Sequence, residues 1–289
     1  MISNIKTISL SGIEGTLVEV QTDITGGLPT FEIVGLPDTS VRESKERIKS
    51  AIKNSNIEFP SRRIIINLAP ASTKKEGTSY DLPIAIGILI AQKEIINNKL
   101  ENTIFIGELS LDGKINRING VLPMCIEAIN LGIRKVILPK ANEREAAVIK
   151  NLEIIGVSNL KEVIEYLNGN KTIEKARVDI LKIFNNKNKE QSDFSEVKGQ
   201  ENVKRALEVA AAGGHNLLMI GAPGSGKSMM AKRLPSILPP LSLGESLETT
   251  KIHSVAGKLN RGSSLISQRP FRDPHHTISQ VAMVGGGRF

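Results

Sequence analysis

The stretch GHNLLMIGAPGSGKSMMAKRL, residues 214–234, decides how the C-terminal part of this chain folds. Four of its residues fit the pattern G-x-x-x-x-G-K-[ST] at the required spacing: Gly221, Gly226, Lys227 and Ser228. The apolar run 217–220 predicts a strand before the loop, and residues 227–234 predict a helix after it. Because chance rarely surrounds this spacing with a strand and a helix, the stretch predicts a phosphate-binding loop and not an incidental glycine turn.

The predicted loop is a site for ATP with Mg²⁺. Its glycines let successive backbone N–H groups turn inward around phosphate oxygens, and the N-terminus of the following helix adds partial positive charge. Lys227 is expected to reach the β- and γ-phosphates, and the Ser228 hydroxyl to ligate the Mg²⁺. The predicted loop residues are Gly221, Ala222, Pro223, Gly224, Ser225, Gly226, Lys227 and Ser228.

Composition and charge fit a two-domain protein with polyanionic partners. The chain has 289 residues, 40% of them hydrophobic, which is more than one ordinary core needs. Its net charge of +8 favours nucleotides or nucleic acid as partners. With two Tyr and no Trp, the chain is poorly suited to form a base-stacking platform for single strands.

The single cysteine and the hydropathy pattern predict a cytoplasmic protein. Cys125 alone forms neither an intrachain disulfide nor a cysteine-based zinc site, and its apolar surroundings predict a buried structural thiol. The N-terminal stretch lacks the pattern of a secretory signal. The longest apolar run, 82–91, is too short to span a bilayer.

Residues 1–168 are predicted to form one α+β domain. Three strand-like segments, rich in β-branched residues, predict an antiparallel opening: 4–13, 15–24 and 29–36. Residues 37–55 predict a helix capped by Asp38 or Ser40. The further predicted elements are a strand at 62–69, a helix at 81–94 capped by Asp81, a strand at 102–110, a hairpin turn at 111–114, helices at 120–132, 141–150 and 159–169, and strands at 135–139 and 152–157.

Residues 169–192 are polar, rich in Asn and Lys, and lack a sustained period. They predict a linker that contains one short helix. A second domain is expected over residues 193–289.

Two stretches around the loop resemble a known family. The segment FSEVKGQENVKRALEVAAAGG, 194–214, is similar to the one that precedes the phosphate loop in AAA+ ATPases, where residues at the positions of Val197 and Gln200 lie near the adenine. Downstream, RPFRDPHHT (269–277) and MVGGG (283–287) resemble signatures of the magnesium-chelatase branch of AAA+ proteins, and specifically of its ComM/YifB group. Asp273 stands where alanine is more familiar, which alters the charge of that segment.

His275 and His276 within this signature suggest a metal site at first sight. Adjacent side chains in an extended segment point to opposite faces, and no cluster of further ligands is near them in the sequence. A loop or interface role is therefore favoured over zinc.

The first domain resembles the proteolytic domain of Lon-type proteases, an α+β fold of the ribosomal S5 domain 2 type. The resemblance is carried by KKEGTSYDLPIA (74–85), GELSLDGKINRINGVLPMCIEA (107–128) and IRKVILPKANERE (133–145). Ser79 falls on the serine position of the Ser-Lys dyad, whereas Leu122 falls on the lysine position. An aliphatic side chain does not activate a hydroxyl, and Lys114 lies on the hairpin and not on the helix. Ser79 is therefore expected to be structural.

The resemblance implies a hexameric, ATP-driven motor that binds DNA and promotes branch migration in natural transformation. The chain ends at Phe289, before an acidic Walker B strand, so we expect ATP binding without hydrolysis by this chain alone and no catalytic residue within it. DNA contacts are expected to be independent of base sequence. Three alternatives remain: a nucleotide-binding interaction protein without motor activity, a magnesium chelatase subunit, and a Ser-Lys peptidase.

Overall fold

The computed structural model describes residues 2–96, 100–185, 193–260 and 262–284. The chain divides into two compact units: unit 1 comprises Met1–Lys182 and Leu247–Leu265, and unit 2 comprises Ile183–Ser246 and Ile266–Phe289. Leu247–Leu265 thus packs with unit 1 although it follows the phosphate-binding loop in the sequence. The domain limits predicted at residues 168 and 193 stay a prediction.

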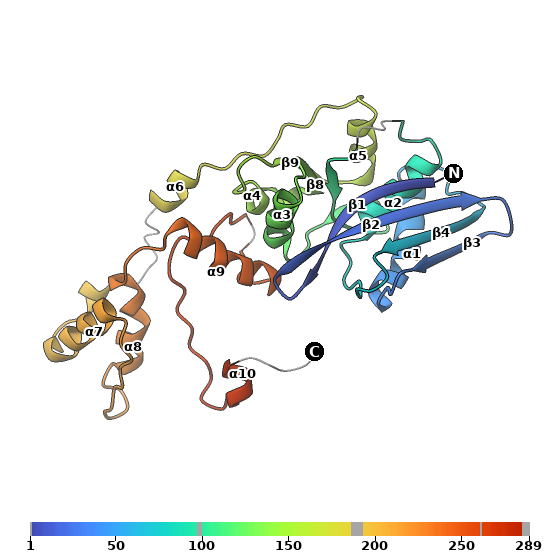
Figure 1. Ribbon diagram of the computed structural model, residues 1–289. Coiled ribbons are helices and arrows are strands. Elements are labelled where there is room, and N and C mark those ends of the chain that lie inside the picture. Colours follow the sequence, from blue (N-terminus) through green and yellow to red (C-terminus); the bar gives the residue numbers. More distant parts are fainter. Residues whose placement is uncertain (1, 97–99, 186–192, 261, 285–289) are drawn as a thin grey trace. The chain divides into compact units, whose positions relative to one another are not determined.

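A seven-stranded mixed sheet lies at the centre of unit 1, in the order β3-β4-β2-β1-β5-β8-β9 (Figure 1). Its strands are β1 (Ile2–Ser11), β2 (Glu14–Thr25), β3 (Thr30–Val34), β4 (Arg63–Ala69), β5 (Thr103–Phe105), β8 (Lys135–Pro139) and β9 (Glu153–Val157). β2 is antiparallel to both of its neighbours, and the other pairs are parallel. The predicted hairpin at residues 111–114 is confirmed between β6 (Glu108–Leu109) and β7 (Ile115–Asn116).

The predicted antiparallel opening is correct for the first two strands and wrong for the third. β3 lies at the sheet edge, parallel to β4, with Thr30 opposite Arg63. The cause is the helix α1 (Thr39–Asn54), which connects β3 to β4, because a helical crossover joins parallel neighbours. β4 then takes the place beside β2.

Helices contribute to two hydrophobic cores on the two faces of this sheet. α1, α2 (Asp81–Ala91) and α5 (Leu160–Leu167) share one core, whereas α3 (Val121–Asn130) and α4 (Glu143–Ala146) belong to the other. At β5, Phe105 belongs to the first core and its neighbours Ile104 and Ile106 to the second, since successive strand residues face opposite sides. Burial on both faces explains the continuous apolar runs of these strands.

The predicted caps of two helices have different outcomes. For α1 the cap is confirmed, because Asp38 Oδ1 accepts a hydrogen bond of 2.8 Å from the Val41 N–H. For α2 the prediction is wrong, since the N-cap is Tyr80 and no side chain caps the helix. The Asp81 carboxylate is instead drawn into an ion pair with Arg47, 2.7 Å away.

The helix predicted over 141–150 is also wrong in its extent. It is a 3₁₀ turn, Lys140–Asn142, followed by the single turn of α4. Asn142 Oδ1 accepts from the Ile118 N–H and Glu145 Oε1 from the Leu122 N–H, both at 3.1 Å. These buried side chains hold the segment against the start of α3.

Unit 2 is helical in its described residues. Its elements are the second half of α6 (Ile180–Asn185), α7 (Glu201–Gly213), α8 (Lys227–Arg233), the first turn of α9 (Leu243–Val255), α10 (Gln280–Val284), and the 3₁₀ turns Phe194–Glu196 and Leu234–Ile237. α6 is the short helix predicted in the linker. The core of the unit consists of Phe194, Val197, Leu207 and Met230.

The strand predicted over residues 217–220 is wrong for this structure. These residues are irregular, and Leu218 and Ile220 are 83% and 88% exposed. A strand's backbone groups need a neighbouring strand to bond to, and none of the described residues of unit 2 forms one. The helix predicted after the loop is confirmed as α8.

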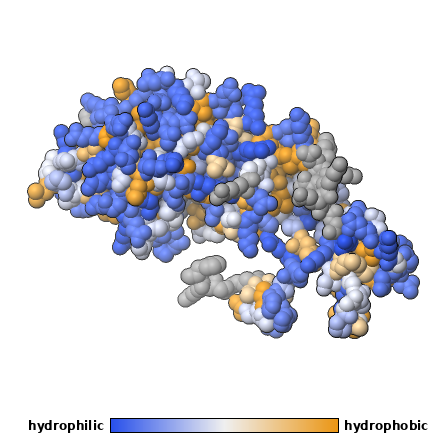
Figure 2. Space-filling model, turned by 180° about the vertical axis from the view of Figure 1, so that it is seen from behind, coloured by the Kyte–Doolittle hydropathy of each residue, from blue (hydrophilic) through white to orange (hydrophobic). Residues whose placement is uncertain are grey.

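Within the described residues, no helix is long and apolar enough to cross a membrane. Hydrophilic residues cover most of the surface that Figure 2 shows. Cys125 is a free cysteine without exposed surface, and burial raises the pKa of its thiol, as expected for a structural residue.

Candidate nucleotide-binding site

The phosphate-binding loop follows a path that its glycines permit. Gly224 and Gly226 have φ angles of 79° and 87°, in the left-handed region that favours glycine. Gly226 is the N-cap of α8, which begins at Lys227. The loop thus leads directly into a helix start, an arrangement that presents backbone N–H groups to an anion.

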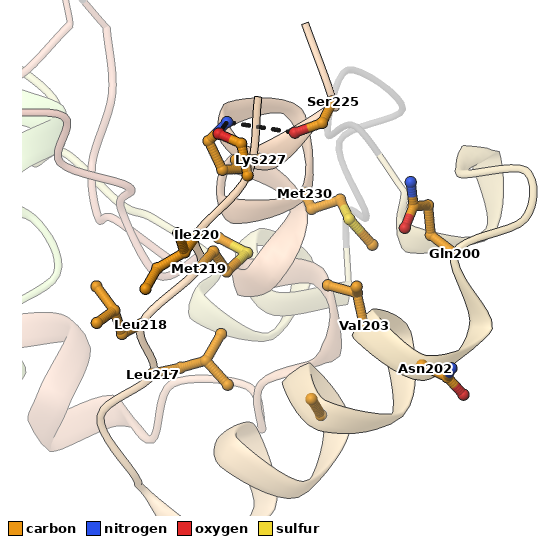
Figure 3. Close-up of a pocket in the computed structure, with 12 residues that line it drawn as sticks. Gln200, Asn202, Val203, Leu217, Leu218, Met219, Ile220, Ser225, Lys227 and Met230 are labelled. Carbon is orange, nitrogen blue, oxygen red and sulfur yellow. Dashed lines mark hydrogen bonds between the residues drawn. The ribbon is translucent and has the colours of Figure 1, made fainter. Parts of the chain in front are cut away.

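Lys227 folds over this loop (Figure 3). Its ammonium donates to the carbonyl oxygens of Gly221 at 2.8 Å and Ala222 at 2.7 Å, and to the Ser225 hydroxyl at 3.2 Å. All three acceptors belong to the loop, so the cation is held beside it. A phosphate oxygen competes well for these protons, because an anionic acceptor forms the stronger hydrogen bond.

The loop borders a pocket of about 370 Å³. Its lining residues are Gln200, Asn202, Val203, Ala206, Leu217, Leu218, Met219, Ile220, Gly221, Ser225, Lys227 and Met230. In Figure 3, Val203 of α7 and Met230 of α8 lie on one side, and the irregular stretch 217–220 lies on the other. The pocket is lined mostly by apolar side chains with a few polar groups, which is the usual character of a small-molecule site.

The structure brings together four of the predicted site residues: Gln200, Gly221, Ser225 and Lys227 line the same pocket. Ala222, Pro223, Gly224 and Gly226 complete the loop beside them. Val197 does not line the pocket; it is buried in the core of unit 2 together with Met230, which does. Val197 therefore supports the pocket wall from behind.

Several lining residues were not predicted from the sequence. Asn202, Val203 and Ala206 come from the first two turns of α7, at helical spacing. The amphipathic period of this helix was visible in the sequence, but the period does not say which face meets a ligand. Gln200, at the N-cap of α7, has a φ of 60°, and such a conformation in a residue other than glycine is often found at functional sites.

For Mg²⁺ the protein offers one ligand in the expected place. Ser228 lies in the first turn of α8 and is exposed, and no side-chain hydrogen bond engages its hydroxyl among the described residues. Within the part of the chain that the structure describes, no acidic residue lines the pocket. These protein ligands therefore fit an ion that arrives with the nucleotide. Phosphate oxygens and water would then supply most of its ligands, as is usual for Mg²⁺.

The RPFRDPHHT segment is anchored within unit 2 by its charged residues. Arg269 Nε donates to the Pro239 carbonyl at 2.8 Å, and Arg269 Nη2 donates to Glu245 at 3.0 Å. Asp273, at the position where alanine is more familiar, lies 3.7 Å from Lys232 of α8. This departure from the family pattern thus adds a surface ion pair to the helix that follows the phosphate-binding loop.

The two histidines of this segment do not point to opposite faces, so that expectation is wrong. The rings of His275 and His276 lie side by side, with centroids 4.1 Å apart, because a turn that begins at His276 replaces the extended backbone. His275 Nδ1 is 2.8 Å from the Thr277 hydroxyl. In the part of the chain that the structure describes, no group of three or more His, Cys, Asp or Glu is placed to hold a metal ion.

In unit 1 the residues at the serine and lysine positions of the Lon-type dyad do not form a Ser-Lys pair. Ser79 is nearly buried at the edge of a pocket of about 290 Å³, and Leu122 is fully buried. Lys114 is exposed and pairs with Asp112 at 2.8 Å. Next to Ser79, the Thr78 hydroxyl donates a hydrogen bond to the Glu108 carboxylate.

Comparison with known proteins agrees with this description of both units. The family profile described as "Subunit ChlI of Mg-chelatase" matches residues 20–142, and the profile described as "Magnesium chelatase, subunit ChlI" matches residues 193–289. Lon protease 2 of Bacillus subtilis is 28% identical over 171 residues, which are 52% of this chain and 30% of the protease. The chain thus combines a ChlI N-terminal domain with Lon-like similarity and part of a Mg-chelatase domain.

Two further relatives match nearly the whole chain. The protein YifB of Escherichia coli is 42% identical over 287 residues, which are 99% of this chain and 55% of YifB. Competence protein ComM of Haemophilus influenzae is 40% identical over 279 residues, 96% of this chain and 54% of ComM. The chain spans about half the length of these curated relatives. On these matches and on its phosphate-binding loop, the chain belongs to the ComM/YifB family of Mg-chelatase-like proteins.

Proposed function

We propose that this chain binds ATP with Mg²⁺ at its phosphate-binding loop, as part of a ComM-type AAA+ ATPase. The observation that carries the proposal is the geometry of the loop, in which Gly224 and Gly226 turn the backbone and Lys227 lies over it. In this proposal unit 1 has the ribosomal S5 domain 2 type of fold, and unit 2 is part of an α/β AAA+ domain.

Each residue of the site has a separate role in this proposal. The loop N–H groups and Lys227 bind and orient the phosphates, while the apolar face of α7 and the stretch 217–220 receive the base. Ser228 holds the Mg²⁺, which neutralises charge on the phosphate oxygens. Val197 and Met230 keep the pocket wall in place.

We further propose that the whole protein is a hexameric motor that moves DNA branch points during natural transformation. The family relationship supports this, since one relative is named a competence protein. The net charge of +8 also suits a polyanionic partner. Because the chain spans about half the length of these relatives, the motor activity is assigned to the whole protein.

We expect this chain alone to bind ATP without hydrolysing it. Hydrolysis needs an acidic residue that holds the metal and orients water, and no Asp or Glu among the described residues lines the pocket. We also expect no peptidase activity from unit 1, because Leu122 stands at the lysine position of the dyad and its side chain provides no base.

The test is ATP binding by isothermal titration calorimetry with and without Mg²⁺. Lys227→Ala is expected to weaken binding at least tenfold, since a charge-assisted hydrogen bond to phosphate contributes about 1.5–3 kcal/mol. Lys232→Ala removes the same charge from the same helix outside the pocket, and serves as the matched control. Equal ATP affinity of wild type and Lys227→Ala would contradict the assignment of the nucleotide site. ATP turnover above background that Lys227→Ala abolishes would contradict the expectation that this chain does not hydrolyse ATP.

A subunit of a magnesium chelatase is the second candidate, favoured by the descriptions of the two matching profiles. The two functions can be distinguished by which molecule stimulates the ATPase activity of the whole protein. Stimulation by branched DNA supports the motor, and stimulation by a porphyrin with its chelatase partners supports the chelatase.

A further inference from the structure

Unit 1 has a hollow that neither the nucleotide site nor the former dyad uses. It is bordered by α1, the edge strand β3 and the loop 59–62, and its volume is about 240 Å³. Four cationic side chains line it: Lys45, Lys49, Lys53 and Arg62. No acidic residue is found in its lining among the described residues. We call this hollow the lysine groove.

The three lysines stand in one row along α1. They are four residues apart, so they share a helix face and rise by about 6 Å from one to the next. This step is similar to the advance of about 7 Å along the helix axis that two nucleotides of one duplex strand make. The core residues Val41, Ile48 and Ile52 lie on the neighbouring side of α1, so the row runs along the border of the face that packs into unit 1.

None of the four cations has a hydrogen-bond or ion-pair partner among the described residues. On an ordinary solvated helix, lysines commonly pair with a glutamate three or four positions away. Glu46 is at that distance from Lys49, yet no ion pair joins them. Four unpaired cations around one hollow are an electrostatic cost that an anionic ligand removes.

Two aromatic side chains, Phe31 and Phe59, contribute to the lining of the groove. The rings of Phe31 and Phe59 are stacked, with centroids 6.1 Å apart and planes inclined by 21°, and both pack against the main core of unit 1. Their faces are thus engaged with each other and with the core, so they are poorly placed to receive a base. The hydroxyl groups of Thr30 and Ser61 add hydrogen-bond donors to the lining.

Acidic residues confine the positive surface to this side of the loop. A separate hollow on the other side of residues 60–62 contains Glu58 and Glu94. Arg62 contributes to both hollows, but the lysine row belongs to the groove alone. Of these two hollows, the lysine groove is therefore the one that suits an anion.

We propose that the lysine groove binds backbone phosphates of a nucleic-acid strand, without reading its bases. Regularly spaced unpaired cations and hydroxyl donors match the phosphodiester backbone, and the engaged phenylalanine rings leave no stacking platform. The choice of nucleic acid among polyanions rests on the proposed function, whereas the anion site itself does not.

The test is the affinity of the whole chain for a fluorescently labelled single-stranded oligonucleotide, measured by anisotropy without nucleotide at several salt concentrations. Lys49→Glu/Lys53→Glu is compared with Lys150→Glu/Lys161→Glu, two exposed lysines that also have no partner among the described residues. Both double variants lower the net charge equally. Thermal unfolding of each variant establishes that it is folded.

The groove variant is expected to bind at least tenfold more weakly than wild type. The slope of log affinity against log salt should become shallower by about 1.4, since each lost phosphate contact removes about 0.7 for a single strand. The control variant should keep the wild-type slope. An equal loss in both variants, or none in the groove variant, would overturn the site.

Competition identifies the polyanion. Unlabelled oligonucleotides of different base sequence should displace the probe equally, and polyglutamate of the same charge should displace it poorly. Efficient displacement by polyglutamate would overturn the assignment to nucleic acid and point to an acidic protein segment. Because no nucleotide is present, a failure of the ATP proposal leaves these results unaffected.

Discussion

Arg269 Nη2 lies 3.0 Å from Glu245 Oε1, and this contact joins the RPFRDPHHT segment to the start of α9. Glu245 is also part of a capping box, in which its Oε2 accepts from the Ser242 N–H at 2.8 Å and its own N–H donates to the Ser242 hydroxyl at 3.3 Å. One carboxylate therefore both caps the helix and anchors the signature segment.

Glu245 should make the stability of α9 depend on acid pH. Its pKa is lowered from 4.5 to about 2, first by the Ser242 N–H and then by Arg269. A depressed carboxyl pKa stabilises the fold above about 4.5, and this contribution is lost as the pH falls towards 2. In thermal unfolding followed by circular dichroism, wild type should have a higher Tm than Glu245→Gln at neutral pH. Near pH 2 the two Tm values should be equal. A constant difference at all pH values would contradict this.

Arg47 should support the buried carboxylate of Asp81. Burial raises the pKa of Asp81 to about 6, and the Arg47 guanidinium opposes that rise. Because the folded pKa exceeds the unfolded value of 3.8, this group stabilises the fold most below 3.8 and loses that contribution as the pH rises through 6. Without Arg47 the loss should be larger.

Urea unfolding measures this effect. Arg47→Met is expected to cost about 3 kcal/mol near pH 7, because it leaves a buried charge without its partner, and clearly less near pH 4, where Asp81 is protonated. Arg42→Met, an exposed arginine on the same helix, is the control and should cost little at either pH. The same cost for Arg47→Met at both pH values would refute the role of Asp81 ionisation.

Adjacent lysines at 74 and 75 should have very different effects on stability. Lys75 is fully buried and donates to the carbonyl oxygens of Pro70 and Thr73, and burial lowers the pKa of its ammonium. Lys75→Met should cost about 2 kcal/mol of unfolding free energy, since it removes hydrogen bonds donated by a charged group at a buried position. Lys74 is exposed and pairs with Glu76, so Lys74→Met should change stability by less than about 0.5 kcal/mol. Similar costs for the two variants would show that the Lys75 contacts contribute little.

Ser79 should not react as a nucleophile. A fluorophosphonate probe is expected to leave the folded chain unlabelled, because Ser79 is nearly buried and the dyad position holds Leu122. A serine protease in the same reaction provides the positive control. Labelling that disappears in Ser79→Ala would revive the peptidase interpretation.

The sequence by itself determined those features that depend on neighbours within one element. The phosphate-binding loop, the Asp38 cap of α1, the turn between β6 and β7 and the helix α8 all follow from residue types at short spacing. Such features are local because a turn or a cap is completed within a few residues. The absence of a base at position 122 was likewise apparent from one residue type.

Only the tertiary structure decided which distant residues meet. It placed β3 beside β4, drew Asp81 to Arg47 instead of to a helix cap, and left residues 217–220 irregular where strand propensity alone predicted a strand. It also brought Phe31, Phe59 and Arg62 to the lysine row of α1, which was not apparent from the periodicity of that helix. The physical reason is that strand pairing, burial and charge partners are set by residues far apart in the chain.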